Sequence, residues 1–544
     1  MQTRDGVRLD ADVYYPNVPG EFPVLLMRQP YGRAIASTVV YAHPQWYAAQ
    51  GFIVVIQDVR GRGSSAGEFH LFAHELEDGY DTVQWAAQLP RSTGEVGMYG
   101  FSYQGMTQLY AAAAKPPALK TICPSMVAYD LYADWAYEGG AFCYQMNLGW
   151  ALQLACETAR RDGDEQAYRE LYAAAHSLSF PDPVCPRSDI LERLAPDSFY
   201  HDWLGNPDPT SSYWTTLSPQ TFLGDVDLPM LHIGGWFDTH LRGTLRLYRA
   251  IAPRSQHPQH LWVGPWAHLP WGRRVGNTDY GSQANSPMDV LQVQWFNQFL
   301  KGKDTGILQQ APVHLFDLGK KQWREFETYP PDAMRSLHLL SDGLAMMGDQ
   351  HGELVSDADG DAPALPDVLV HDPWRPVPAM GGHATIPTGP CDRFLLDSRT
   401  DVATYTTEPL VEYWSIVGEP VVELYCSADA PSFDLCAVLS EVMADGRVIY
   451  ISQGYLRVDL ADVGAIAPHQ ITLQPTCITL LAGSALRLSI SGACFPAYAM
   501  NPGTGTEPYD SRLIEARVIT ITIAAAELGR SRLMLPHIFS AAAR

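Results

Sequence analysis

Short apolar runs alternate with amphipathic segments along the first third of the chain. Residues 23–28 (PVLLMR) and 52–57 (FIVVIQ) are bounded by glycine or proline on at least one side, which is typical of buried strands. Residues 119–124 (LKTICP) read as a further strand, and residues 75–89 carry apolar positions at the spacing of a helix that lies on a sheet. Strands that alternate with helices predict a parallel sheet covered by helices on both faces.

The alternation stops near Ala128. Residues 129–222 are rich in aromatic residues and alanine, have helical periodicity and contain no strand-like run, so we expect an inserted helical cap. Strand-like runs then return at 229–235 and 259–264, followed by a predicted helix at 287–302.

After Gly306 the pattern changes to short alternating segments separated by glycine, proline and aspartate, which is typical of an all-β sandwich or jelly roll. The sequence therefore predicts three parts. An α/β domain takes residues 1–128 and 223–310, the cap takes 129–222, and a C-terminal β-sandwich (jelly roll) takes 311–544.

Ser102 lies at the junction of a strand-like and a helix-like stretch, between Gly100 and Gly105. We interpret this arrangement as a nucleophile elbow of the G-x-S-x-G type, in which a strained turn exposes a serine hydroxyl above a parallel sheet. The α/β domain is then an α/β-hydrolase domain. An ordinary strand–helix turn with small residues is the alternative.

A nucleophilic serine needs a general base and an acid that orients the base. In α/β-hydrolases these follow the serine in the order acid, then histidine. Asp238 follows the strand-like run 229–235, and His268 follows the run 259–264. Asp225 and Asp227 precede their strand and are therefore at its wrong end, while His232 and His240 read as structural residues.

Net charge limits the partners of the chain. With 37 basic and 60 acidic residues, the formal charge is −23, which repels a phosphate backbone and makes nucleic acid an unsuitable partner. No apolar run approaches about 18 residues, so no membrane span is expected. The first residues (MQTRDGVRLDADVYYP) lack the apolar core of a signal peptide, which predicts a cytoplasmic protein.

The nine cysteines are scattered, without a C-x-x-C pair, and read as reduced buried thiols. Neither they nor the histidines form a metal-binding pattern, so we expect no metal. The acidity and the large β region leave a homodimer open.

Several separated motifs occur in the order typical of one family. The segments GFSYQGMTQ, GGWFDTHLRG, GPWAH and QDVRGRGSSAGEF together resemble the cocaine-esterase / X-Pro dipeptidyl-peptidase family of serine hydrolases. The resemblance implies an α/β-hydrolase domain, a helical cap and a jelly roll. It also implies a Ser102–His268–Asp238 triad, an oxyanion hole made by the Tyr31 hydroxyl and the Tyr103 amide, and no cofactor.

The expected function is hydrolysis of an ester or acyl-amide bond of a small molecule through an acyl-enzyme. An X-Pro dipeptidyl aminopeptidase and a β-lactam acylase or amino-acid ester hydrolase are alternatives within the family, and a non-catalytic carbohydrate-binding protein is an alternative outside it. Asp134 and Glu138 could capture a substrate ammonium or lie on a solvated helix face. Substrate-binding candidates in the cap are Trp135, Tyr144 and Trp150.

Overall fold

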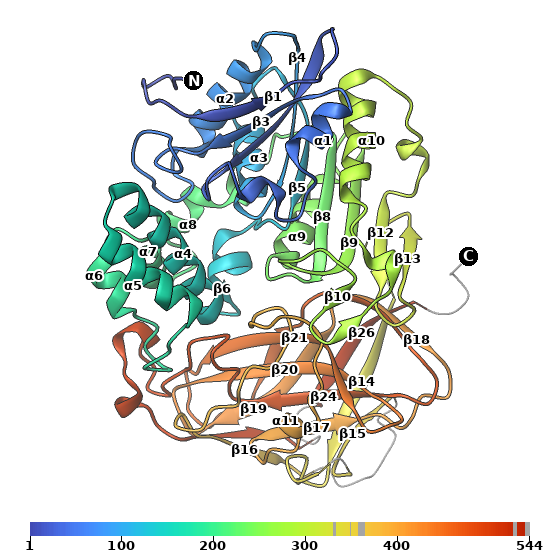
Figure 1. The fold of residues 1–544 in the computed structure, drawn as a ribbon. Helices are drawn as coiled ribbons and strands as arrows, with labels where there is room; N and C mark the ends of the chain where they lie inside the picture. The colour runs from blue at the N-terminus through green and yellow to red at the C-terminus, as the bar shows by residue number, and fades with distance from the viewer. Residues whose placement is uncertain (330–332, 349, 357–364, 526–529, 539–544) are drawn as a thin grey trace.

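The computed structural model describes residues 1–329, 333–348, 350–356, 365–525 and 530–538. An α/β region with blue and green strands lies at the top of Figure 1, a group of teal helices at its side and a β-rich region in yellow to red below. Within the described part, no helix combines the length and the apolar character needed to cross a membrane.

The α/β region is built on a nine-stranded sheet with the order β1-β3-β2-β4-β5-β8-β9-β12-β13. The pairs from β3 to β12 are parallel, and β1 and β13 are antiparallel at the two edges. The strands are β1 (Ala11–Tyr14), β2 (Phe22–Gln29), β3 (Ile53–Asp58), β4 (Ser92–Phe101), β5 (Leu119–Ser125), β8 (Met230–Phe237), β9 (Gln259–Ala267), β12 (Val313–Asp317) and β13 (Gln322–Phe326).

Helices cover both faces of this sheet, which explains why its strands are apolar at successive positions. In β2, Val24 and Leu26 pack in the core that includes α2 and α3, while Leu25 and Met27 pack in the core that includes α1 and α10. These helices and α9 are α1 (Pro44–Ala49), α2 (Glu75–Ala87), α3 (Tyr103–Ala113), α9 (Leu241–Ile251) and α10 (Met288–Lys301).

The helical segment is inserted between β5 and β8, where the sequence predicts it (Figure 1). It also contains a hairpin of two strands, each two residues long, that the periodicity does not predict, because strands this short show no alternation. The elements are η2 (Tyr132–Ala136), β6 (Tyr137–Glu138), β7 (Ala141–Phe142), α4 (Tyr144–Asp162), α5 (Glu165–His176), α6 (Asp189–Leu194), α7 (Phe199–Gly205), α8 (Ser212–Leu217) and η3 (Pro219–Thr221).

The C-terminal region is built mainly of β-strands, and its described residues form thirteen strands in one hydrogen-bonded network. Every pair in it is antiparallel except β15 with β17. The strands are β14 (Met334–Ser341), β15 (Gly352–Val355), β16 (Asp367–His371), β17 (Val402–Thr406), β18 (Trp414–Gly418), β19 (Val421–Ala428), β20 (Ser432–Val442), β21 (Val448–Asp459), β22 (Ala467–Thr472), β23 (Thr476–Leu480), β24 (Ala485–Ser491), β25 (Ile519–Ile523) and β26 (Arg532–Ile538).

One predicted boundary is misplaced. The sequence assigns every strand after residue 310 to the β-sandwich, but β12 pairs with β9 and β13 pairs with β12, so both complete the α/β sheet. An edge strand and a sandwich strand have the same alternation, and pattern alone does not distinguish them. The remaining short elements are η1 (Ala36–Thr38), β10 (Arg274–Val275), β11 (Thr278–Asp279), η4 (Ser282–Ala284), η5 (Ile307–Gln309), α11 (Phe394–Asp397), η6 (Pro508–Asp510) and η7 (Leu513–Glu515).

Candidate active site

Ser102 occupies the sharp turn between β4 and α3. Its backbone has φ 59° and ψ −129°, a conformation that is strained for a residue with a side chain. Its N–H donates to the Ser125 carbonyl oxygen at 2.9 Å, which fixes the turn to the end of the neighbouring strand β5. The strand–turn–helix context expected of a nucleophile elbow is therefore present.

The glycines around this turn differ from the G-x-S-x-G spacing. Residue 104 is glutamine, and the second glycine is Gly105, three positions after the serine. A Cβ on Gly105 would lie 2.4 Å from Val127 Cγ1 and 2.7 Å from the Ser125 carbonyl oxygen. Gly105 is thus needed for the close approach of α3 to the segment after β5, and the predicted motif is corrected to G-x-S-x-x-G.

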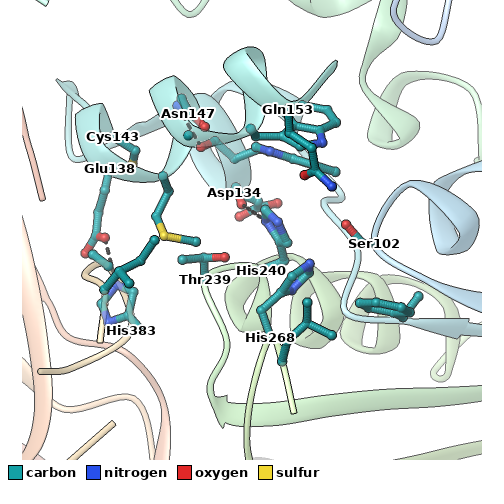
Figure 2. A pocket seen from close by; sticks show the side chains of 18 of the residues that line it. Ser102, Asp134, Glu138, Cys143, Asn147, Gln153, Thr239, His240, His268 and His383 are labelled. Carbon is teal, nitrogen blue, oxygen red and sulfur yellow. Dashed lines mark hydrogen bonds and ion pairs between the residues drawn. The ribbon is translucent and has the colours of Figure 1, made fainter. Parts of the chain in front are cut away.

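Asp238 and His268 directly follow the neighbouring strands β8 and β9. Both therefore lie with Ser102 at the carboxyl-terminal ends of the parallel strands, which we call the sheet edge. The Asp238 carboxylate is fully buried, and its Oδ1 lies 2.7 Å from His268 Nδ1. Bonding at Nδ1 orients the imidazole and leaves Nε2 for another partner. Figure 2 shows Ser102 and His268 reaching into one pocket from separate elements.

Tyr31 follows β2 at the same edge, and its hydroxyl is hydrogen-bonded to Ser102 and to Trp150. Burial raises the pKa of the Tyr31 phenol to about 12, so the phenol keeps its proton and remains a donor at neutral pH. The Tyr103 amide is the first N–H of α3 and has no acceptor within the helix. The two predicted oxyanion donors therefore flank Ser102.

A buried ion pair supports the start of α3 from beneath. The Arg28 guanidinium lies 2.5 Å from a carboxylate oxygen of Glu75, and the Tyr103 hydroxyl donates to the other oxygen at 2.8 Å. The Arg28 Nε also donates to Gln57 at 2.8 Å. The low dielectric of the interior strengthens these contacts, which join β2, β3, α2 and α3.

Ser102 and His268 open into a cavity of about 620 Å³ between the sheet edge, the helical insertion and the β-rich region. Trp135 and Trp150 line it, as predicted, and their ring centroids are 4.9 Å apart. Tyr144 is outside its lining, because the buried Tyr144 ring packs against Phe180. The aromatic density of the cap did not distinguish pocket walls from the internal packing of the cap.

Asp134 and Glu138 also line the cavity, but both are buried rather than on a solvated helix face. Asp134 Oδ1 lies 2.7 Å from Arg246 Nη1, and Glu138 Oε1 lies 2.7 Å from Arg242 Nη1. His383 bonds to the second oxygen of Glu138 at 2.9 Å. Helix α9 thus supplies one arginine to each carboxylate.

Burial raises the pKa of both carboxylates, but their cationic neighbours oppose it to different extents. It raises the pKa of Asp134, where the Arg246 charge only partly opposes it. At Glu138, burial also favours the neutral acid, but Arg242 and His383 outweigh it and hold the pKa at about 2. The Glu138 carboxylate is therefore ionised and matched by a fixed cation.

His240 is a pocket residue that the sequence interpretation assigned only to structure. It immediately precedes α9, as expected, yet it lines the cavity with its ring centroid 5.1 Å from that of His268 (Figure 2). Its Nδ1 bonds to the Asp134 carbonyl oxygen at 3.0 Å, and burial lowers its pKa to about 4. Its place two residues after Asp238 was the one sequence signal for this role.

Among the described residues, no group of three His, Cys, Asp or Glu side chains is arranged to hold a metal ion. All nine cysteines are free thiols.

Comparison with known proteins identifies the family. The model of the X-Pro dipeptidyl-peptidase (S15 family) matches residues 5–270, and that of the X-Pro dipeptidyl-peptidase C-terminal non-catalytic domain matches residues 305–527. Cocaine esterase from Rhodococcus sp. (strain MB1 Bresler) is 31% identical over 92% of this chain and 91% of its own length. A putative serine esterase from Mycobacterium bovis is 26% identical over 95% and 93%.

Solved structures share the whole fold. An aminopeptidase from a marine sediment archaeon (Thaumarchaeota archaeon) superposes with a TM-score of 0.81 at 23% identity, covering 99% of this chain and 95% of its own. An α-amino acid ester hydrolase gives 0.81 at 21% identity, covering 98% and 95%. At these identities the likeness establishes the fold.

The fold and the family matches define a serine hydrolase with an α/β domain and a separate all-β domain. The chain belongs to the cocaine-esterase / X-Pro dipeptidyl-peptidase family of serine hydrolases, which confirms the resemblance carried by its motifs. A non-catalytic carbohydrate-binding protein is thereby excluded.

Proposed function

We propose that this enzyme hydrolyses carboxylic esters of small, uncharged molecules through an acyl-enzyme. The Ser102 oxygen attacks the ester carbonyl, and His268 accepts the serine proton and returns it to the leaving alcohol. Asp238 fixes the imidazole and stabilises its charged form. The Tyr31 hydroxyl and the Tyr103 amide donate to the oxyanion, and water then repeats the sequence to release the acid.

One observation carries this proposal: a strained serine lies in the same cavity as a histidine whose Nδ1 is bound by a buried carboxylate at 2.7 Å. Each of the three residues follows a parallel strand, so a rigid sheet sets their spacing. Catalytic groups held in this way need little reorganisation during the reaction.

The cavity walls favour an uncharged, partly apolar substrate. Trp135 and Trp150 line its interior, and the exposed side chains of Ile35, Leu269 and Ile386 line the cavity as well. Apolar surface of this kind gains about 25 cal/mol for each Å² of substrate that it covers. The related cocaine esterase is named for an ester substrate, which agrees with this class.

Recognition of a substrate ammonium is disfavoured by the charges of the cavity. Among its described lining residues, the only carboxylates are Asp134 and Glu138, and an arginine already neutralises each of them. An ammonium group would have to leave water without an unpaired anion to receive it. We therefore favour an esterase over an X-Pro aminopeptidase or an amino-acid ester hydrolase.

A substrate panel tests this assignment. Acetyl, butyryl and benzoyl p-nitrophenyl esters, an X-Pro anilide and an acylated β-lactam are compared on the wild type and on Ser102→Ala. We expect turnover of the esters, little of the anilide, and no turnover or fluorophosphonate labelling in Ser102→Ala. Ser64→Ala, in the loop after β3, is the matched control and keeps both. Faster turnover of the anilide than of every ester would overturn the preference for esters.

The compartment and the oligomeric state stay predictions. The nine free thiols support the cytoplasm, where cysteines remain reduced. Light scattering would measure whether the chain forms a homodimer.

A further inference from the structure

The hydroxyl of Tyr31 has a second partner beside Ser102. Trp150, in α4, directs its indole Nε1–H at the Tyr31 oxygen, with 3.2 Å between nitrogen and oxygen. An indole nitrogen donates and does not accept. The phenol oxygen therefore accepts one hydrogen bond on the cap side, which leaves its own proton to donate in another direction.

This arrangement gives the hydrogen-bond chain a direction. A hydroxyl that accepts one hydrogen bond becomes a better donor in the next, because each bond polarises its neighbour. The Tyr31 proton then points toward Ser102 and toward the oxyanion that forms beside it. The proton of Ser102 is left for the base, and the bond to Trp150 stabilises negative charge on the phenol oxygen.

Trp150 is held firmly enough to fix this direction. Its ring packs between Trp135, at 4.9 Å between centroids, and Phe199, at 4.7 Å. Helix α4 is tied to the loop after β3 by the buried Arg62, whose guanidinium donates to the Leu154 carbonyl at 2.9 Å and to Thr158 at 3.1 Å. These contacts hold helix α4 in a fixed position relative to Tyr31.

We propose that Trp150 is a positioning residue for the oxyanion hole: its indole N–H aims and polarises the Tyr31 hydroxyl. The proposal rests on the oxyanion role of Tyr31 under the proposed function. It gives Trp150 a part in the chemical step in addition to its place in the pocket wall. The cap thereby contributes to transition-state stabilisation through a side chain of the α/β domain.

A double-mutant cycle on p-nitrophenyl acetate tests this. Tyr31→Phe removes the donor and should lower kcat about 10²- to 10³-fold. Trp150→Phe keeps an aromatic ring but removes the N–H, and should lower kcat about 5- to 10-fold with KM little changed. In the Tyr31→Phe background the same substitution should change kcat less than about 2-fold, because its target is gone.

Trp135→Phe is the matched comparison, since it alters the neighbouring indole of the same wall without touching the bond to Tyr31. Its effect should be the same in the wild-type background and in the Tyr31→Phe background. Equal kcat losses from Trp150→Phe in both backgrounds would overturn the positioning role. A wild-type kcat in Tyr31→Phe would instead overturn the proposed oxyanion hole, so the two failures are distinguishable.

Binding of butylboronic acid gives a readout independent of turnover. The boronic acid forms a tetrahedral adduct with the serine and places an oxygen in the oxyanion hole. Its affinity should fall in Trp150→Phe by about the same factor as kcat, and should be unaffected by that substitution in the Tyr31→Phe background. Thermal unfolding of each variant checks the fold, and an unchanged affinity in a folded Trp150→Phe would contradict the proposal.

Discussion

The sheet edge and the helical cap both hold buried carboxylates near the pocket, but they give these groups different partners. At the sheet edge, Asp238 bonds to His268, and within the described residues its second oxygen has no hydrogen-bond partner. In the cap, Asp134 and Glu138 each face an arginine of α9. Under the proposed function, Asp238 can stabilise an imidazole that becomes positive, whereas each carboxylate of the cap already has a fixed cation beside it.

The difference separates two tasks that one pocket has to perform. A charge that acts in the transition state must be held without a permanent counter-ion, and the rigid sheet makes this possible. A charge that only joins elements is stable when a cation stays beside it. Substitutions on the two sides should therefore affect different quantities, catalysis at the sheet edge and folding at the cap.

The largest effect is expected at the sheet edge. Ser102→Ala, His268→Ala and the double mutant should each lose roughly 10⁶-fold in kcat, because a triad acts as a unit and its losses do not add. Unfolding free energies should change little. Steady-state kinetics and urea unfolding measure the two quantities, and losses that multiply in the double mutant would show that one residue is misassigned.

At the cap, two arginines one helical turn apart provide a matched pair. Both lie 2.7 Å from a carboxylate oxygen, but the Arg242 side chain is 11% exposed and that of Arg246 is 43% exposed. Arg242→Met leaves the ionised Glu138 buried without its cation and should lower the unfolding free energy by about 3 kcal/mol. Arg246→Met should cost about 1 kcal/mol or less, since water screens that pair.

Urea unfolding of the two variants side by side is the measurement. Equal losses would mean that exposure does not control the strength of these bridges. A kcat loss in Arg242→Met larger than in any sheet-edge variant would abolish the division between the two sides of the pocket.

The sequence predicts the positions of site residues better at the sheet edge than in the cap. Ser102, Asp238 and His268 each come directly after a strand, and the edge of a parallel sheet brings such positions together whatever the loops do. In the cap, position along the chain carries less information. Tyr144 and Trp150 both lie in α4, yet only the packing of the cap against the sheet decides which of them lines the pocket.

Other misses have related causes. The pairing of Asp134 and Glu138 with arginines more than a hundred residues away depends on tertiary contacts that no local pattern encodes. Likewise β12 has the alternation of a sandwich strand, and its assignment to the α/β sheet depends on the edge of β9 being open to it. Local patterns predict elements and the sheet edge, and long-range packing decides partners.

Acid should expose the charge of the cap. Because the pKa of Glu138 is lowered to about 2 in the folded protein, its stabilisation is complete above its ordinary value of 4.5 and is lost as the pH falls toward 2. The stability gap between wild type and Glu138→Gln should shrink by about 3 kcal/mol over this range. Asp134 has a raised pKa in the folded protein, so the unfolding free energy of the wild type should rise relative to that of Asp134→Asn as the pH falls.

Urea midpoints at several pH values between 5 and 2.5 give both slopes. If the stability difference from the wild type changed with pH in the same direction for both variants, the arginines would not set the charge state of these carboxylates.

The smallest effect concerns substrate choice, in which the cap wall acts by its surface. Trp135 lines the pocket and is almost fully buried, so Trp135→Ala removes apolar surface that a benzoyl group would cover and an acetyl group would not reach. At about 25 cal/mol for each Å², loss of some 50 Å² of contact lowers kcat/KM for benzoyl relative to acetyl p-nitrophenyl esters about 5- to 10-fold. Tyr144→Phe, a change in the same cap outside the pocket, is the control and should leave the ranking of the esters unchanged. An equal loss on both esters in Trp135→Ala would instead mean that Trp135 only holds the cap together, because a wall that contacts the acyl group has to distinguish a large one from a small one.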